Sequence, residues 1–128
     1  MDIPQDRQYS SDHEWIETLG DGKVRIGITD YAQDALGDVV FVDLPELNLT
    51  VEASQSICEV ESTKSVSDIY APVSGTIVEV NDELSDAPER LNSDPYSEGW
   101  ICVLDVGETG PLDGLLSAAS YQELTEGE

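Results

Sequence analysis

Lysine is nearly absent from this sequence, and the two that occur, Lys23 and Lys64, are the residues best suited to carry chemistry on a modified amine. Lys23 follows a Gly-Asp-Gly turn, where we expect a solvated charge at the start of a strand. Lys64 lies in Val60–Asp68, where Ser and Thr neighbours suit a tight hairpin turn and leave its ammonium sterically accessible. The spacing alone favours an ordinary exposed lysine on a hairpin, with a site of enzymatic modification as the second interpretation.

The other reactive side chains make a poor case for catalysis. Cys58 and Cys102 lie in apolar runs, so we predict free buried thiols, with one disulfide as the alternative. His13 is the only histidine, which argues against a zinc site and, without a Ser or Cys partner, against nucleophilic catalysis. The sequence has no Gly-rich phosphate loop, and carboxylates are too common in it for a pair to be informative.

The charge is strongly acidic, with 5 basic and 28 acidic residues and a net charge of −23. An apolar fraction of 39% and clear strand patterns favour a folded domain over a disordered segment. Carboxylates crowded on a compact surface repel one another, and salt near 1 M shortens the screening length to about 3 Å. We therefore expect a halophilic source and loss of stability at low salt, and no binding to nucleic acid or anionic membranes.

The elements that must position Lys64 are short strands between turn signals. Val24, Ile26 and Ile28 alternate with other residues as in a half-buried strand, and the remaining segments are short apolar runs. No run is long enough to span a membrane, and the N-terminal residues do not resemble a signal peptide, so we expect a soluble cytoplasmic protein. We predict one all-β sandwich or barrel domain over residues 1–128, with strands at 24–28, 39–42, 57–61, 66–70, 76–80 and 101–104.

Two helices interrupt the strands. Thr29 or Asp30 can cap a short helix near 30–36, with Gly37 as its end. Leucines and an alanine at helical spacing from Pro111 to Leu124 predict a C-terminal amphipathic helix.

A weak internal repeat suggests two similar halves. Residues 37–42 and 75–80 share the form Gly-x-apolar-Val-x-Val, and residues 57–60 resemble 101–104. Two quasi-symmetric sheets, with Lys64 in an exposed hairpin between them, are one interpretation; the general likeness of β-strands is the other.

The segment Glu61-Ser62-Thr63-Lys64-Ser65, followed by Ala71-Pro72-Val73-Ser74-Gly75, resembles the lipoyl-attachment segment of lipoyl carriers. The chain from about residue 8 to 124 is similar to one such family, the H protein of the glycine cleavage system. The segments that carry this resemblance are His13–Ile16, Gly27–Gln33, Leu36–Pro45 and Asp94–Trp100. Biotin carriers present their lysine between methionines, and Met1 is the only methionine here. The lipoyl domains of 2-oxo acid dehydrogenases lack the His-Glu-Trp and Asp-Pro-Tyr segments.

The resemblance implies a mainly β lipoyl/biotinyl-type barrel-sandwich hybrid of two antiparallel sheets, and a carrier rather than an enzyme. Lipoic acid would be joined covalently to Lys64. The arm would take the aminomethyl group of glycine from a pyridoxal-phosphate-dependent glycine decarboxylase to a tetrahydrofolate-dependent aminomethyltransferase. Dihydrolipoamide dehydrogenase would reoxidise it, and a lipoate-attachment enzyme would first modify the lysine. We expect a monomer, and a lipoyl-relay protein without glycine cleavage partners is the alternative.

The resemblance also implies a cleft that shelters the loaded arm. By position, Glu14 and Asp68 match carboxylates near that cleft, and Ile28, Ala32 and Leu36 match its apolar wall. The family usually has Ser before its His-Glu-Trp segment, where this chain has Asp12, so an extra carboxylate is expected at the cleft. Surface charge and ordinary core packing are the alternative roles of these residues.

Overall fold

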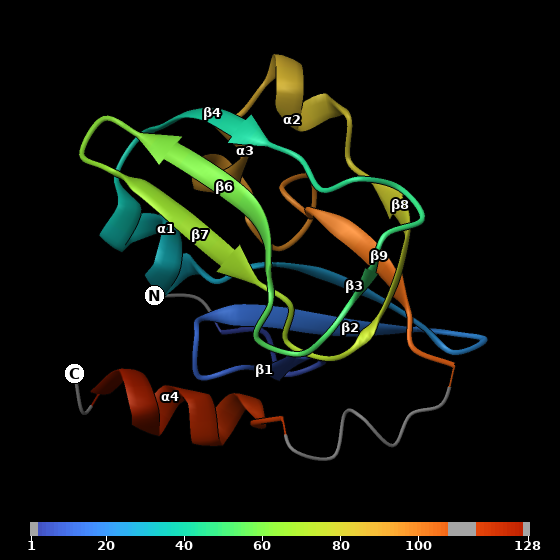
Figure 1. The fold of residues 1–128 in the computed structure, drawn as a ribbon. Helices are drawn as coiled ribbons and strands as arrows, with labels where there is room; N and C mark the ends of the chain where they lie inside the picture. The colour runs from blue at the N-terminus through green and yellow to red at the C-terminus, as the bar shows by residue number, and fades with distance from the viewer. Residues whose placement is uncertain (1–2, 108–114, 127–128) are drawn as a thin grey trace.

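The strands form two antiparallel sheets (Figure 1). The computed structural model describes residues 3–107 and 115–126. The six-stranded sheet contains, in spatial order, β1 Gln8–Tyr9, β2 Glu14–Gly20, β3 Lys23–Ile28, β9 Cys102–Asp105, β8 Gly75–Val80 and β5 Thr50–Val51. The three-stranded sheet contains β4 Val39–Asp43, β6 Ser56–Ser62 and β7 Val66–Tyr70. This confirms the mainly β fold with two antiparallel sheets, and all six predicted strands are present.

The core lies between the sheets. It consists of the inward-facing Val, Ile and Leu side chains of both sheets, and Ile26, Val60 and Leu104 are fully buried in it. Two short helices, α2 Glu83–Asp86 and α3 Arg90–Ser93, were not predicted; each contributes one buried leucine, Leu84 or Leu91, to the same core.

The helix α1, Asp30–Leu36, has the predicted bounds. The Thr29 side chain caps it by accepting a hydrogen bond from the Ala32 N–H at 3.2 Å. Gly37 ends it with φ 82° and ψ −161°, a conformation that a residue with a Cβ rarely adopts. The helix lies close to the β6–β7 hairpin (Figure 1).

The C-terminal helix starts later than predicted. It is α4, Ala118–Glu126, and residues 111–114 of the predicted span lie outside the described residues. Leu116 cannot belong to the helix because its N–H and C=O both bond to the backbone of Tyr9, at 2.7 and 2.8 Å. Ser117 then starts the helix by accepting from the Ser120 N–H. The helix packs on β1 through a second cluster that includes Tyr9, Trp15 and Tyr121.

The internal repeat appears in the strand pairing. The two similar Gly-containing segments form β4 and β8, which pair antiparallel with β6 and β9, and both pairs carry a register irregularity. The registers of the two pairs differ by two residues. Val42 faces Val60, and its counterpart Val80 faces Cys102, whereas Leu104 is the residue that corresponds to Val60 in the repeat.

Candidate functional site

Lys64 is exposed at the tip of the hairpin between β6 and β7. Hydrogen bonds between neighbouring residues fix the tip. The Ser62 N–H donates to the Ser65 carbonyl at 2.8 Å, and the Ser62 hydroxyl oxygen accepts from the N–H groups of Lys64 and Ser65, both at 3.2 Å. Within the described residues, the Lys64 ammonium has no ion pair or side-chain hydrogen bond. The tip therefore combines a fixed backbone with a free amine.

The hairpin tip is fastened to the end of α1. The Thr63 N–H donates to the Asp38 carbonyl at 3.0 Å, and the Lys64 stem lies over Gly37. A Cβ on Gly37 would approach the Lys64 Cε to 3.1 Å. Asn92 holds this corner from the other side, because its Nδ2 donates to the Gly37 carbonyl and its Oδ1 accepts from the Val39 N–H, both at 2.8 Å. The backbone from which the Lys64 side chain extends is thus held in place by contacts among the hairpin tip, the end of α1 and Asn92 of α3.

Glu14 is a buried carboxyl group at the far end of β7 from Lys64. Its side chain accepts hydrogen bonds from the Ser10 hydroxyl at 2.8 Å and from the Tyr70 N–H at 3.2 Å. Burial raises the pKa of Glu14 from 4.5 to about 7 and the nearby charge of Asp12 adds to the rise, while the two hydrogen bonds oppose it. Glu14 can therefore hold or release a proton near neutral pH.

The other two expected carboxylates lie in more open positions. Asp12 is exposed in the turn before β2. Asp68 is exposed on β7, where it faces Glu59 of β6 and accepts a hydrogen bond from the Ser56 hydroxyl at 3.3 Å. Asp68 and Glu14 thus have separate hydrogen-bond partners. Asp68 lies in β7, and Glu14 lies in β2 and contacts β7 at Tyr70.

The three expected apolar residues lie on the strand and helix beside this region. Ile28 and Leu36 are buried members of the main core, and Ala32 is half-buried against it. Of these three, Ala32 has the most surface available to an arm lying outside the core.

The two cysteines are free and buried, as predicted. Burial raises the pKa of the Cys58 thiol to about 12, and burial likewise raises the pKa of the Cys102 thiol far above its ordinary value. A thiol needs to ionise to act as a nucleophile, so neither cysteine is suited to thiol chemistry near neutral pH.

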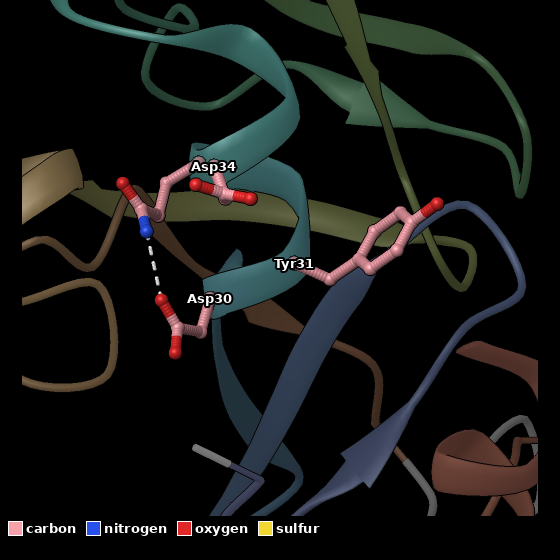
Figure 2. Close-up of a pocket in the computed structure, with 4 residues that line it drawn as sticks. Asp30, Tyr31 and Asp34 are labelled. Carbon is pink, nitrogen blue, oxygen red and sulfur yellow. Dashed lines mark hydrogen bonds between the residues drawn. The ribbon is translucent and has the colours of Figure 1, made fainter. Parts of the chain in front are cut away.

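An open depression of about 330 Å³ lies on the exposed side of α1, lined by Asp30, Tyr31, Gln33 and Asp34. Figure 2 shows the Gln33 amide donating to Asp30, at 2.7 Å, while the Tyr31 ring points away from the two carboxylates. Among the described residues no group of His, Cys, Asp or Glu side chains could hold a metal ion. The depression adds no reactive group to the site.

A two-sheet β fold that presents a fastened lysine on a hairpin, without a partner among the described residues, fits the class of carriers that hold a covalently attached arm. The family model described as Glycine cleavage H-protein matches residues 7–128. The chain belongs to this family, and it is a non-catalytic lipoyl carrier of glycine cleavage.

The relatives are similar over nearly the whole chain. A glycine cleavage system H protein of Thermus thermophilus is 57% identical over 128 residues, covering 100% of this chain and 99% of the relative. One from Nocardia farcinica is 53% identical and covers 97% of each chain. The crystal structure of a glycine cleavage system H protein from Mycobacterium marinum has a TM-score of 0.88 at 47% identity, covering 97% of this chain and 99% of that one.

These comparisons give no support to the expected halophilic source, since the relative from Halorhodospira halophila, at 47% identity, is less similar than the one from Thermus thermophilus. None of the helices in the described part of the chain has the length and hydropathy needed to cross a membrane.

Sequence reasoning missed the contacts of two residues that shape the site. The capping pattern identifies Gly37 only as a helix end, although it also provides the surface on which the Lys64 stem lies. Asn92 carries no local signal, because its contacts join segments more than 50 residues apart.

Proposed function

We propose that Lys64 is the lipoyl attachment site through which this chain carries the aminomethyl group of glycine. The observation that supports the proposal most directly is an exposed amine without a partner among the described residues, on a hairpin whose backbone is fixed at Ser62. Lys23, the other lysine, is also exposed, but it lies within a strand, where it pairs with Gly20 of β2 and Asp105 of β9. In the part of the chain that the structure describes, acylation of Lys64 breaks no ion pair.

Lipoic acid joined by an amide to the Lys64 Nζ supplies a redox-active disulfide at the end of a flexible tether. The chain itself fixes the root of that tether, because Gly37 and Asp38 support the hairpin tip from below. Tethering raises the effective concentration of the arm at each active site without tight binding. The proposed partners are the pyridoxal-phosphate-dependent glycine decarboxylase, the aminomethyltransferase, dihydrolipoamide dehydrogenase and the lipoate-attachment enzyme, and the proposed setting is a single-domain monomer in the cytoplasm.

We further propose that the loaded arm rests along the free edge of β7, with α1 on its other side. β7 is an edge strand of its sheet, and about 13 Å of it separates Val66 from Tyr70. The buried Glu14 lies at the Tyr70 end, and a bound aminium group nearby would favour the ionised form of its carboxyl group. Ala32 provides apolar surface, and the buried Ile28 and Leu36 support it from the core.

The roles of Asp12 and Asp68 in this resting site are secondary. Asp12 raises the pKa of Glu14 and thereby influences its protonation. Asp68 faces outward beside Glu59, so it contributes negative potential to the arm's path.

Intact-mass analysis and peptide mapping test the attachment. The chain is incubated with lipoate, ATP and a bacterial lipoate-protein ligase, and we expect a single lipoyl adduct confined to the peptide that contains Lys64. An adduct on Lys23, or none, would contradict the proposal. The lipoylated chain is then combined with glycine decarboxylase and labelled bicarbonate, and it should support exchange of label into glycine.

A further inference from the structure

The outer face of the three-stranded sheet carries an apolar patch next to the lysine. Strand register places Phe41, Glu61 and Val66 side by side across β4, β6 and β7. Phe41 is 48% exposed and Val66 is 58% exposed. Neighbouring strands are about 4.8 Å apart, so the row is about 10 Å wide. Val40, Phe41 and Val66 form what we call the tip patch, and the exposed Glu61 lies between Phe41 and Val66.

A register irregularity in β4 explains why two adjacent apolar residues of this strand are both exposed in the patch. Strict alternation would turn either Val40 or Phe41 toward the core, but the pairing of β4 with β6 shifts between Val39 and Phe41. Val40, 55% exposed, and Phe41 therefore both face solvent. Such bulges aim side chains away from their regular direction. Adjacent exposed apolar side chains contribute little to folding and are typical of an interaction site.

An acidic row borders the tip patch on the side away from Lys64. The same register aligns Asp43, Glu59 and Asp68 across the three strands, and all three are exposed. Since the whole chain carries a net charge of −23, a second copy would bring like charges together on this face. A partner with a basic rim around an apolar recess would be attracted to it.

We propose that the tip patch is the docking surface of the enzyme that acylates Lys64. This rests on the proposed attachment site. An enzyme that acts at the end of a long arm can work at a distance from the hairpin, whereas one that acylates the amine must bring its active site to Nζ itself. Val66 is two residues from Lys64, and Phe41 lies about 10 Å from Val66 in the same cross-strand row, so both are within reach of an enzyme bound at Nζ.

The reaction at this surface is an acyl transfer. The deprotonated Lys64 Nζ attacks the carbonyl carbon of an activated acyl donor, such as an acyl adenylate, and an amide bond forms. The bond from that carbon to the activating group breaks, and its electron pair leaves with the activating group. The nitrogen, which lost one proton from the ammonium before the attack, loses a second proton to solvent or to a base of the enzyme and keeps one in the amide.

The test measures the acylation rate of the unmodified full-length chain with lipoate, ATP and a bacterial lipoate-protein ligase. The variant Phe41→Thr/Val66→Thr keeps strand-forming side chains but removes the apolar surface. Leu19→Thr/Val78→Thr is the matched control, since Leu19 and Val78 are exposed apolar residues on strands of the other sheet. Thermal unfolding monitored by circular dichroism verifies that both variants fold.

We expect kcat/KM for acylation to fall at least about tenfold in the patch variant and to stay within about twofold of wild type in the control. Added NaCl should slow acylation of the wild type, and Asp43→Asn/Glu59→Gln should weaken that salt dependence. A patch variant that is acylated at the wild-type rate overturns the inference. If that variant also fails to support exchange with the glycine decarboxylase, the patch binds the decarboxylase instead. Absence of acylation in the wild type would instead contradict the attachment site.

Discussion

The side chain of Lys64 lies against the α-carbon of Gly37, so that a methyl group added there would come within 3.1 Å of the Lys64 Cε. The end of α1 thereby sets the direction in which the lysine leaves the hairpin. Because Gly37 also has φ 82°, this position depends on the absence of a Cβ in two separate ways.

Gly37→Ala should both destabilise the chain and displace the Lys64 stem. The backbone strain is expected to cost about 1–3 kcal/mol of unfolding free energy. Gly20→Ala is the matched control, because Gly20 has φ 95° but nothing within 4 Å of its added Cβ. Urea unfolding should show a loss in both variants. Only Gly37→Ala should remove the nuclear Overhauser effects between the Lys64 side chain and residue 37; their persistence would contradict the packing.

Lys64→Arg should abolish the lipoyl adduct and carrier activity while leaving the fold intact. Arginine keeps the charge and the stem but cannot form the amide, and an exposed substitution of this kind changes stability by less than about 0.5 kcal/mol. Lys23→Arg is the control and should be lipoylated normally. Intact mass and bicarbonate exchange are measured for both, and carrier activity in Lys64→Arg would rule out this attachment site.

Glu14 should make the folded state less stable as the pH rises toward 7. The pKa of Glu14 in the folded chain is about 7, above the 4.5 of the unfolded chain, so between these values the folded state holds a proton that the unfolded state has released. From about pH 5.5 to about pH 8 this group alone should lower the unfolding free energy by about 2 kcal/mol. The decrease is complete once the pH exceeds about 7.

Glu14→Gln isolates this contribution, because the amide has nearly the same shape and does not titrate in this range. Urea unfolding is measured at both pH values in the two proteins, and the difference between their pH dependences cancels the other carboxylates. Equal pH dependence in wild type and variant would show that Glu14 is already ionised in the folded state at low pH.

The sequence predicted the elements whose signals are local. Thr29 and Gly37 bound α1 through capping chemistry that needs only neighbouring residues, and the apolar runs predicted six strands with small errors at their ends. The strand β2 was missed, because Glu14 at its start interrupts the apolar pattern. Glu14 is nevertheless buried, since it accepts a hydrogen bond from the Tyr70 N–H, 56 residues away.

The contacts around the lysine were not predictable in the same way. The exposed Phe41 follows from a register shift between β4 and β6, and within a run of four apolar residues nothing marks which side chains face solvent. The start of α4 was wrong because Leu116, which fits the helical spacing, uses its backbone groups to pair with Tyr9. These are contacts between distant segments, and periodicity carries no information on them.

Salt should stabilise the folded chain, whether or not the chain comes from a halophilic organism. With a net charge of −23, compaction brings carboxylates together, and salt between about 10 mM and about 1 M shortens the screening length from about 30 Å to about 3 Å. We expect the melting temperature to rise by several degrees in KCl over this range. Sucrose of matched osmolality is the control for effects other than screening. A melting temperature that does not change with KCl would show that repulsion between carboxylates does not destabilise the folded chain.

Tyr121→Phe should loosen the docking of α4. The Tyr121 hydroxyl group lies 2.7 Å from both His13 Nδ1 and Thr29 Oγ1, so it links α4 to the cap of α1 in a buried environment. Its removal leaves buried polar atoms with fewer partners, which typically costs about 1–3 kcal/mol. Tyr70→Phe is the control, because the Tyr70 side chain is 36% exposed and its hydroxyl can bond to water. Urea unfolding should show the loss only for Tyr121→Phe; an equal effect in both variants would mean that the hydroxyl link does not hold the helix.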